Sequence, residues 1–210
     1  MDTIKEMIGP EVEHAKVFFR NALMQTMDIT TEELQPLIDV AQLVSCKKGQ
    51  VIINQGEASQ YIYFICKGVI RVYFYLNDKL IIERFEKEGG IFGGNYAYLT
   101  MKPGTYIYEA VENMEMLRIK YTDLQKVVKQ YDKIDDLYRH NLETYYNNHA
   151  MTMYVFKSLS SAERYDQFVR QYGDITNRVS LKDIANYLGM TPETLSRVRA
   201  VYNKNQRKGK

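Results

Sequence analysis

The feature that most constrains the fold is the twenty-residue stretch 181–200, LKDIANYLGMTPETLSRVRA. Apolar residues recur at helical spacing on both sides of a glycine, and a small alanine lies where two helices would cross. The positions are Ile184, Ala185, Leu188, Gly189, Met190, Leu195 and Val198. Glycine supplies the positive φ that a tight turn requires, and the apolar faces can meet in one wedge. The pattern predicts a helix-turn-helix.

The second helix of this unit is predicted to begin sharply at Pro192. Thr191 is suited to cap it, proline favours a first turn, and Glu193 lies near the positive end of the helix dipole. Its outward face then presents Thr191, Pro192, Glu193, Ser196, Arg197 and Arg199. Arginine pairs bidentately with guanine, glutamate accepts from cytosine, and serine or threonine can serve either. We interpret this face as a DNA-reading surface; the alternative is a helical hairpin with a solvated polar face.

Charge is distributed unevenly along the 210 residues. The net charge is only +2, but residues 157–210 hold eleven lysines and arginines against five acidic residues. A basic C-terminal part on an acidic remainder suits a nucleic-acid-binding module joined to a domain that does not touch nucleic acid. The phosphate contacts are expected from Lys182, Arg199, Lys204, Arg207 and Lys208.

Three observations bear on the cellular compartment. Cys46 and Cys66 have no CxxC spacing or histidine cluster, which favours reduced thiols over a disulfide framework or a zinc site. The acidic, broken N-terminus is unlike a signal peptide, and no apolar run is long enough to span a bilayer. We therefore expect a cytoplasmic protein with no membrane partner.

The N-terminal two thirds of the chain changes its period twice. Residues 1–40 are predicted helical, and Thr30 with Glu33 resembles a capping box, although Pro36 favours a helix that begins later. From residue 41 to 120 the apolar residues alternate, which predicts an antiparallel barrel or sandwich. The expected strands are 43–45, 51–54, 61–66, 69–76, 79–85, 106–110 and 114–119.

Helical patterns return at residue 121 and continue to the end of the chain. A long helix is expected from residue 132 toward 157, because this stretch lacks glycine and proline. Its proposed seam, with heptad-type spacing, is Ile134, Leu137, Asn141, Thr144, Asn148, Met151 and Val155. The seam suits a homodimer, or alternatively a single amphipathic helix packed on the β-domain. A further helix, 162–171, is expected after a cap at Ser160 or Ser161.

This order of elements resembles the Crp/Fnr superfamily of bacterial transcription regulators. The motifs that carry the resemblance are residues 49–56 (GQVIINQG), 61–68 (YIYFICKG) and 191–197 (TPETLSR). It implies an α+β fold: an N-terminal antiparallel β-roll of the cyclic-nucleotide-binding, jelly-roll type with flanking helices, a long dimerisation helix, and a C-terminal winged helix-turn-helix domain. The expected boundaries are 1–131, 132–158 and 159–210. Any terminal wing is expected to be short or absent.

The resemblance also implies partners and roles. The partners are double-stranded DNA, a second copy of the chain and RNA polymerase. Glu193 and Arg197 match the pair that reads the half-site, whereas Pro192 stands where many relatives have an arginine. The complete expected DNA-binding set is Lys182, Thr191, Pro192, Glu193, Thr194, Ser196, Arg197, Arg199 and Lys204.

The sensor region departs from the pattern of cyclic-nucleotide-binding members. Gly94 replaces the glutamate that binds ribose, and the loop 100–106 has no arginine for the phosphate, only Lys102. A buried phosphate without a paired guanidinium is costly to desolvate, so we expect no ordinary cyclic AMP binding. An unknown small-molecule effector would meet Gly93, Gly94, Asn95, Tyr96 and Tyr106. The alternating tyrosines of this region either line such a pocket or pack the core and the dimer, and packing is favoured.

Other function classes have less support from the sequence. Two isolated cysteines cannot hold an iron–sulfur cluster, and His140 and His149 are poor support for haem, so no cofactor or metal is expected. A cupin-like enzyme needs histidines on its strands, and residues 41–120 contain none. The remaining alternative to a DNA-binding regulator is a helical-hairpin protein-interaction module on a ligand-binding β-barrel, without DNA binding.

Overall fold

The computed structural model describes residues 4–93 and 104–208, with side chains up to residue 204. The chain forms two compact units. Residues 1–74 and 84–142 make up the first unit, and residues 75–83 and 143–210 make up the second.

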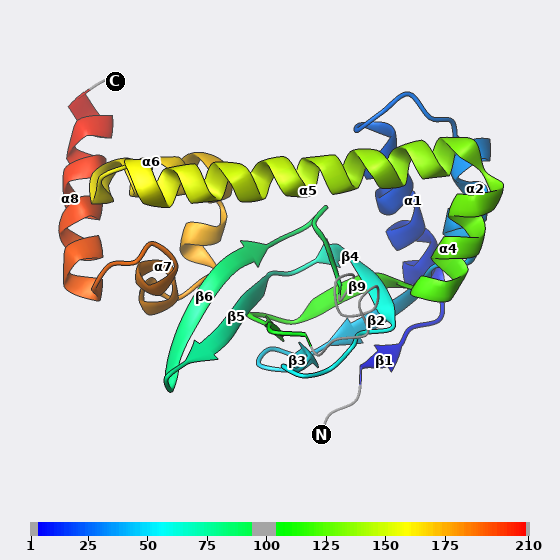
Figure 1. The fold of residues 1–210 in the computed structure, drawn as a ribbon, viewed down its shortest axis with the longest axis horizontal. Helices are drawn as coiled ribbons and strands as arrows, with labels where there is room; N and C mark the ends of the chain where they lie inside the picture. Colours follow the sequence, from blue (N-terminus) through cyan, green and yellow to red (C-terminus); the bar gives the residue numbers. More distant parts are fainter. Residues whose placement is uncertain (1–3, 94–103, 209–210) are drawn as a thin grey trace. The chain divides into compact units, whose positions relative to one another are not determined.

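Helices and strands alternate in blocks along the chain (Figure 1). The strands are β1 (Lys5–Glu6), β2 (Gln42–Cys46), β3 (Val51–Ile53), β4 (Tyr61–Lys67), β5 (Ile70–Leu76), β6 (Lys79–Glu86), β7 (Ile91–Gly93), β8 (Ile107–Ala110) and β9 (Met114–Lys120). The helices are α1 (Pro10–Met24), α2 (Thr31–Asp39), α4 (Tyr121–Gln130), α5 (Asp132–Ser158), α6 (Ser161–Tyr172), a 3-10 turn η1 (Ile175–Asn177), α7 (Leu181–Tyr187) and α8 (Pro192–Lys208).

The β-strands form two sheets. One has the order β1-β2-β9-β4-β7 and the other has the order β3-β8-β5-β6. All seven strands expected from the sequence are present, and the α+β architecture is confirmed. Sequence reasoning missed β1 and β7, because runs of two or three residues are too short to show alternation.

The five-stranded sheet buries both of its faces, because neighbouring residues of a strand point to opposite sides. In β4, Phe64 packs with α1, α2 and α4, whereas Ile65 faces the second sheet. The same division separates Leu43 from Val44 in β2 and Leu117 from Met116 in β9. Figure 1 shows the three helices gathered on one side of this sheet. The first unit therefore has a helix-covered core and an inter-sheet core.

Helix α2 begins with the capping box that the sequence suggests. Thr30 Oγ accepts a hydrogen bond from the backbone N–H of Glu33, and the Glu33 carboxylate accepts one from the N–H of Thr30. Pro36 lies inside the helix, so the alternative start at this proline is wrong. Proline has no N–H, so α2 lacks the hydrogen bond that residue 36 would otherwise donate to the carbonyl of Glu32.

The long helix α5 is present, but the proposed dimer seam is wrong in its first half. Ile134 and Leu137 are buried in the core of the first unit, and the Asn141 amide donates to the carbonyl of Leu137. These side chains are therefore committed to their own chain. The exposed apolar residues of α5 include Leu142, Tyr146 and Met153, which are 42%, 72% and 56% exposed. They lie about a third of a turn or more away from the predicted seam.

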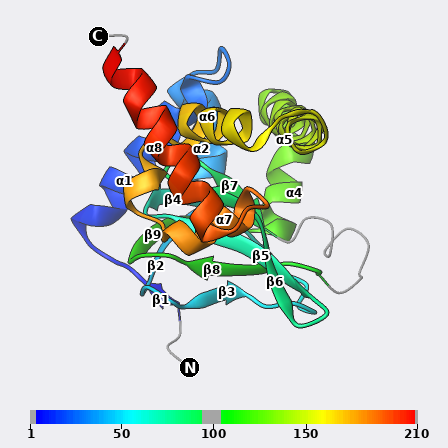
Figure 2. The same ribbon diagram turned by 90° about the vertical axis from the view of Figure 1, so that its left-hand side faces the viewer.

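Helices α6, α7 and α8 pack together in the second unit (Figure 2). Ser160 caps α6 through a capping box with Glu163, and its hydrogen bonds hold the pKa of the Glu163 carboxyl below its usual value. Phe168 and Tyr172 of α6 pack against Tyr187 of α7, with ring centroids 5.7 Å and 6.1 Å from that of Tyr187. This aromatic contact fixes α7 on α6.

The tip of the β5–β6 hairpin belongs to the second unit and is hydrogen-bonded to Asn186 of α7. Asn77 and Asp78 turn the hairpin with positive φ values of 49° and 61°, as a tight two-residue turn requires. The Asn186 amide donates to the Leu80 carbonyl at 2.8 Å and accepts from the Ile82 N–H at 2.7 Å. Asn186 thus pairs with the edge of β6 as a neighbouring strand would.

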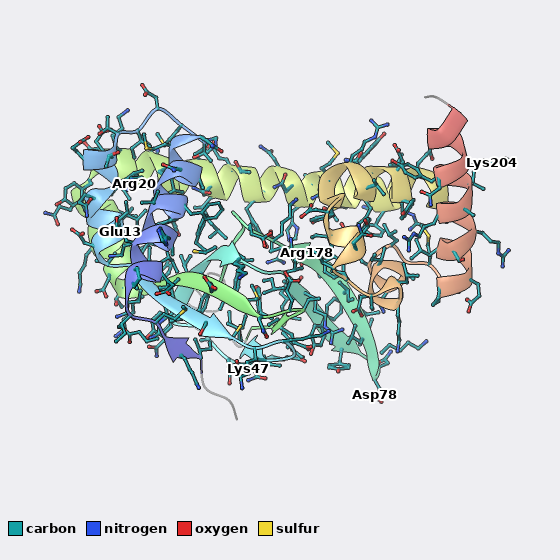
Figure 3. The ribbon with its side chains drawn as sticks, turned by 180° about the vertical axis from the view of Figure 1, so that it is seen from behind. Glu13, Arg20, Lys47, Asp78, Arg178 and Lys204 are labelled. Atoms are coloured by element: carbon teal, nitrogen blue, oxygen red, sulfur yellow. The ribbon has the colours of Figure 1, made fainter. Side chains whose placement is uncertain are left out.

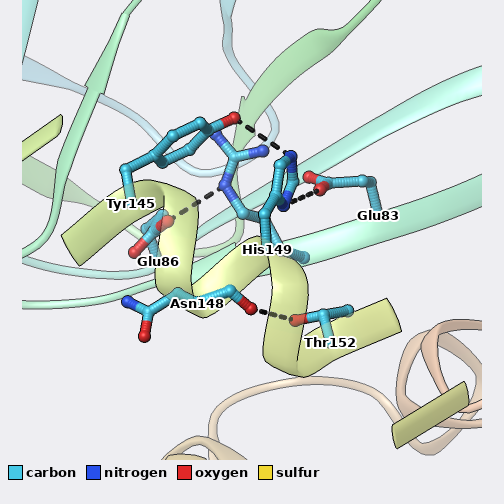
Figure 4. Close-up of polar contacts among 7 residues, drawn as sticks. Glu83, Glu86, Tyr145, Asn148, His149 and Thr152 are labelled. Atoms are coloured by element: carbon cyan, nitrogen blue, oxygen red, sulfur yellow. Dashed lines mark hydrogen bonds and ion pairs between the residues drawn. The ribbon is translucent and has the colours of Figure 1, made fainter. Parts of the chain in front are cut away.

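A second group of contacts joins the same hairpin to α5 (Figure 4). Nδ1 of His149 lies 3.6 Å from the Glu83 carboxylate, and Nε2 of the same ring lies 3.2 Å from the hydroxyl of Tyr145. The hairpin tip is therefore held to both α5 and α7 within the second unit.

Replacing Asn186 by alanine is expected to destabilise the second unit. The change leaves a half-buried N–H and C=O of β6 without their partner, which costs about 1–3 kcal/mol of unfolding free energy. Urea unfolding followed by circular dichroism measures the change. Asn203→Ala, on the exposed side of α8, is the control and should leave the stability unchanged. Equal stability of Asn186→Ala and the wild type would contradict this account of the contact.

Candidate nucleic-acid interface

The turn between α7 and α8 has the geometry that the sequence predicts. Ser180 caps α7 by accepting a hydrogen bond from the N–H of Asp183 at 3.1 Å. Gly189 takes a φ of +63°, a conformation that residues with a Cβ rarely adopt. The N–H of Met190 then donates to the Ala185 carbonyl at 2.9 Å, which closes the end of α7.

The two helices bury a small apolar wedge. Four of the predicted positions, Ile184, Ala185, Leu188 and Leu195, are each only 1% exposed, while Met190 and Val198 are half-buried. Tyr187 is also buried, although the sequence pattern did not assign it. An aromatic residue at that position has no special signal in a single sequence, because its partners on α6 are distant along the chain.

The N-terminus of α8 is held by Thr191. Its hydroxyl oxygen accepts from the N–H of Thr194 at 3.2 Å and lies 3.2 Å from the Thr194 hydroxyl. Pro192 is the first residue of the helix, as expected. The Glu193 carboxylate accepts from its own backbone N–H and from Thr191, and together with the nearby positive charge of Arg197 these bonds lower the pKa of Glu193. An ionised acceptor therefore lies at the start of α8.

The expected DNA-binding residues lie together on and near α8. Thr191, Pro192, Glu193, Ser196 and Arg197 are exposed on its first turns, whereas Thr194 and Arg199 are half-buried. Lys182 is exposed on α7, and Lys204 is exposed near the other end of α8 (Figure 3). Among the described residues, none of these four cations forms an ion pair within 4.0 Å. Arg207 and Lys208 lie outside the described side chains.

The expected effector pocket is described only in part. Gly94, Asn95, Tyr96 and Lys102 lie outside the described residues. Gly93 ends β7 in close contact with β4, since a Cβ there would lie 2.8 Å from the carbonyl oxygen of Tyr61. Tyr106 is half-buried, and its ring packs edge-on against Phe74 at 5.9 Å.

Several tyrosines of the first unit pack the core, as favoured from the sequence. Tyr63, Tyr73 and Tyr108 are at least 93% buried. Phe92 stacks on both Tyr63 and Tyr108, with centroids 4.9 Å and 5.5 Å away. The Tyr73 hydroxyl donates to Glu109 at 2.8 Å. Aromatic packing and a buried hydrogen bond account for these side chains without a ligand.

The cysteines are free thiols, as the sequence indicates. Burial raises the pKa of Cys46 to about 11 and that of Cys66 to about 12. Within residues 4–93 and 104–208, no group of three or more His, Cys, Asp and Glu side chains is placed to hold a metal ion. None of the described helices is long and apolar enough to cross a membrane.

Comparisons with known proteins identify the architecture. Residues 43–131 match the model of the cyclic nucleotide-binding domain family. The structure of FixK2 from Bradyrhizobium japonicum is similar with a TM-score of 0.69 and 22% identity, over 80% of this chain and 86% of that one. The chain has the fold of the Crp/Fnr regulators. The fold that the sequence resemblance implies is thus confirmed.

Two further Crp/Fnr structures cover most of both chains. The catabolite activator protein of Thermus thermophilus has a TM-score of 0.55 and 18% identity, over 88% of each chain. The c-di-GMP responsive global regulator CLP of Xanthomonas campestris has a TM-score of 0.61 and 16% identity, over 86% of this chain and 93% of that one. No curated protein sequence matches the chain significantly.

The ionisation of Glu193 is expected to depend on Thr191. Because the pKa of this carboxyl is lower in the folded state, its charged form stabilises the start of α8 at neutral pH, and this contribution is lost as the pH falls through the folded pKa. In Thr191→Val the pKa of Glu193 should rise, as measured by carboxyl ¹³C NMR titration. Ser196→Ala is the matched control on the same face and should leave the titration unchanged. An unchanged midpoint in Thr191→Val would contradict the assigned hydrogen bond.

Proposed function

We propose that the chain is a homodimeric, sequence-specific DNA-binding transcription regulator, acting in the cytoplasm of a bacterium. The observation that carries this proposal is the exposed face of α8, where an ionised glutamate and an arginine four residues later project from the first two turns of a helix that Thr191 caps. A helix that is capped at its start and packed on its inner side holds its outer side chains in a fixed geometry, as base recognition requires.

Glu193 and Arg197 would read base edges in the major groove. Their spacing places both on one side of α8, one turn apart. The Arg197 guanidinium can pair bidentately with guanine, and the ionised Glu193 carboxylate can accept from the amino group of cytosine. Ser196 and Thr191 are exposed beside them and would add shorter contacts. Thr194 would act mainly through the cap, because its hydroxyl and N–H both meet Thr191.

Phosphate contacts would come from cations around this centre. Lys182 and Lys204 are exposed and free of ion pairs within the described chain, and Arg199 is half-buried beside the reading face. Pro192 donates no N–H, so contact there would be through packing against sugar or base. Such cations fix the register of a protein on DNA without reading its sequence.

A second copy of the chain would pair through the exposed apolar face of α5. Leu142, Tyr146 and Met153 are spaced four and seven residues apart, which keeps them on one side of a helix. This face replaces the seam proposed from the sequence. Pairing gives two reading helices for two half-sites, and the bound dimer would then act on RNA polymerase.

The β-roll would serve as the sensor, with an effector that differs from ordinary cyclic AMP. Gly94 in place of the ribose-binding glutamate and the lack of arginine in residues 100–106 support this proposal. Tyr63 and Tyr108 fill space between the two sheets, and a ligand cannot occupy the same space. Neither enzymatic activity nor a bound cofactor is part of the proposed function.

Arg197→Ala is expected to weaken binding to the preferred DNA site, found by selection from random sequences, by about 1–3 kcal/mol and to relax the preference at one base pair. Fluorescence anisotropy on matched and mismatched duplexes measures both effects. Arg170→Ala is the control, because Arg170 is an exposed arginine of α6 that pairs with Asp166.

Two outcomes would contradict this reading of α8. An equal loss on every sequence would make Arg197 a phosphate contact alone. A wild-type affinity that does not fall with salt would exclude phosphate contact altogether and would favour the alternative, in which the helical hairpin binds another protein.

Tyr146→Glu is expected to dissociate the dimer, because it places a charge in the middle of the apolar face of α5. Analytical ultracentrifugation should show at least a tenfold rise in the dimer dissociation constant. Tyr154→Glu is the matched control: this tyrosine is 57% exposed, but it lies about 100° around the helix from Met153. Dimers of unchanged stability in Tyr146→Glu would refute the proposed pairing face.

A further inference from the structure

A pocket of about 240 Å³ lies in the second unit between α5, α6 and the end of α7. Its walls combine one arginine, three amide side chains and three aromatic rings, with no carboxylate among the lining residues. The arginine is Arg164, the amides are Asn148, Gln167 and Gln171, and the rings are Phe156, Phe168 and Tyr187. None of them belongs to the face of α8 described above or to the β-roll.

Arg164 brings a positive charge to this pocket that the described chain does not neutralise. Its Nε is buried without a hydrogen-bond partner among the described residues, and Nη2 lies 3.4 Å from the Ser161 hydroxyl. Its guanidinium carbon lies 5.7 Å from the centroid of the Phe156 ring. Desolvation of an unpaired guanidinium N–H is unfavourable, and an anionic acceptor would relieve it.

The nearby acidic side chains of α6 are already engaged. The Glu163 carboxylate accepts hydrogen bonds from Ser160 in the capping box. Asp166 pairs with Arg170 at 2.9 Å. The charge of Arg164 is therefore available to a bound anion.

Amide groups add hydrogen-bonding capacity around the same space. Gln167 and Gln171 lie one turn apart on α6, and Asn148 faces the pocket from α5. Among the described residues, none of these three side-chain amides has a hydrogen-bond partner. They can both donate to a carboxylate and accept from a ring substituent.

The apolar wall suits a flat ligand. Phe156 and Phe168 flank Tyr187, with ring centroids 5.8 Å and 5.7 Å from it, and the Phe156 ring stands nearly perpendicular to that of Tyr187. Aromatic side chains favour stacked or edge-on contacts with another ring. The volume is smaller than that of sites for drug-sized molecules, which limits the ligand to one or two rings.

We propose that this pocket binds a small aromatic carboxylate, with the carboxylate on Arg164 and the ring against Phe156, Phe168 and Tyr187. The ligand would touch α5, α6 and α7 together. Leu188 also lines the pocket and directly precedes Gly189, so occupancy stabilises one placement of the α7–α8 turn. Binding at this pocket does not rest on the proposed function.

The probe for this site is 2-naphthoate, with 2-naphthamide as its neutral analogue. Isothermal titration calorimetry on the full chain should show saturable naphthoate binding at least tenfold tighter than that of naphthamide. Arg164→Gln should weaken naphthoate binding at least tenfold. Arg170→Gln, which changes an exposed arginine of the same helix, should leave the affinity unchanged.

A second measurement applies to the wild-type chain and does not depend on the folding of a variant. The Nε–Hε NMR signal of Arg164 should shift with naphthoate, with a midpoint equal to the calorimetric dissociation constant. No saturable binding at millimolar naphthoate, equal binding of naphthamide, or an Arg164 signal that does not move would each overturn the proposal. Naphthoate binding by a chain that fails to bind DNA would retain this site and reject only the proposed function.

Discussion

The apolar wedge between α7 and α8 is the interaction on which the candidate interface depends. Burial of Ile184, Leu188 and Leu195 stabilises the pair by about 1.5–3 kcal/mol for each side chain. Because these residues occupy the inner side of both helices, the opposite side of α8 is left to Glu193, Ser196 and Arg197. The positive φ of Gly189 allows the chain to reverse within the few residues that this packing leaves.

Two consecutive residues of α7 contact different neighbours. Asn186 pairs with the edge of β6 at the hairpin tip, and Tyr187 faces the aromatic residues of α6 and the pocket beside Arg164. An edge strand normally presents unpaired N–H and C=O groups to solvent, and a side-chain amide offers both complementary groups at once. The short helix α7 thus contacts the hairpin tip, lines the pocket and packs against α8.

The first unit uses its aromatic residues in another way. Its two sheets are joined by stacked rings of Tyr63, Phe92 and Tyr108, and Tyr73 is tied to Glu109 by a hydrogen bond. This packing accounts for Tyr63, Tyr73 and Tyr108 without requiring a bound molecule. The family model identifies the domain type. The sequence nevertheless lacks the glutamate and the arginine of an ordinary cyclic-nucleotide site.

Local patterns in the sequence determined most of the elements and much of the candidate interface. Alternation predicted the strands, the Thr30–Glu33 pair predicted a cap, and residues 181–200 predicted two helices, their turn and the exposed face, because each of these depends on residues only a few positions apart. Tertiary structure decided which partner each surface meets. The periodicity of α5 indicated which positions are apolar, but it did not show what each of them contacts. In the folded chain Ile134 and Leu137 are buried in the first unit, whereas Tyr146 is exposed. Likewise, Asn186 meets β6 across more than a hundred residues, and the pocket around Arg164 joins three helices. Such contacts arise from the packing of distant segments, which no local spacing encodes.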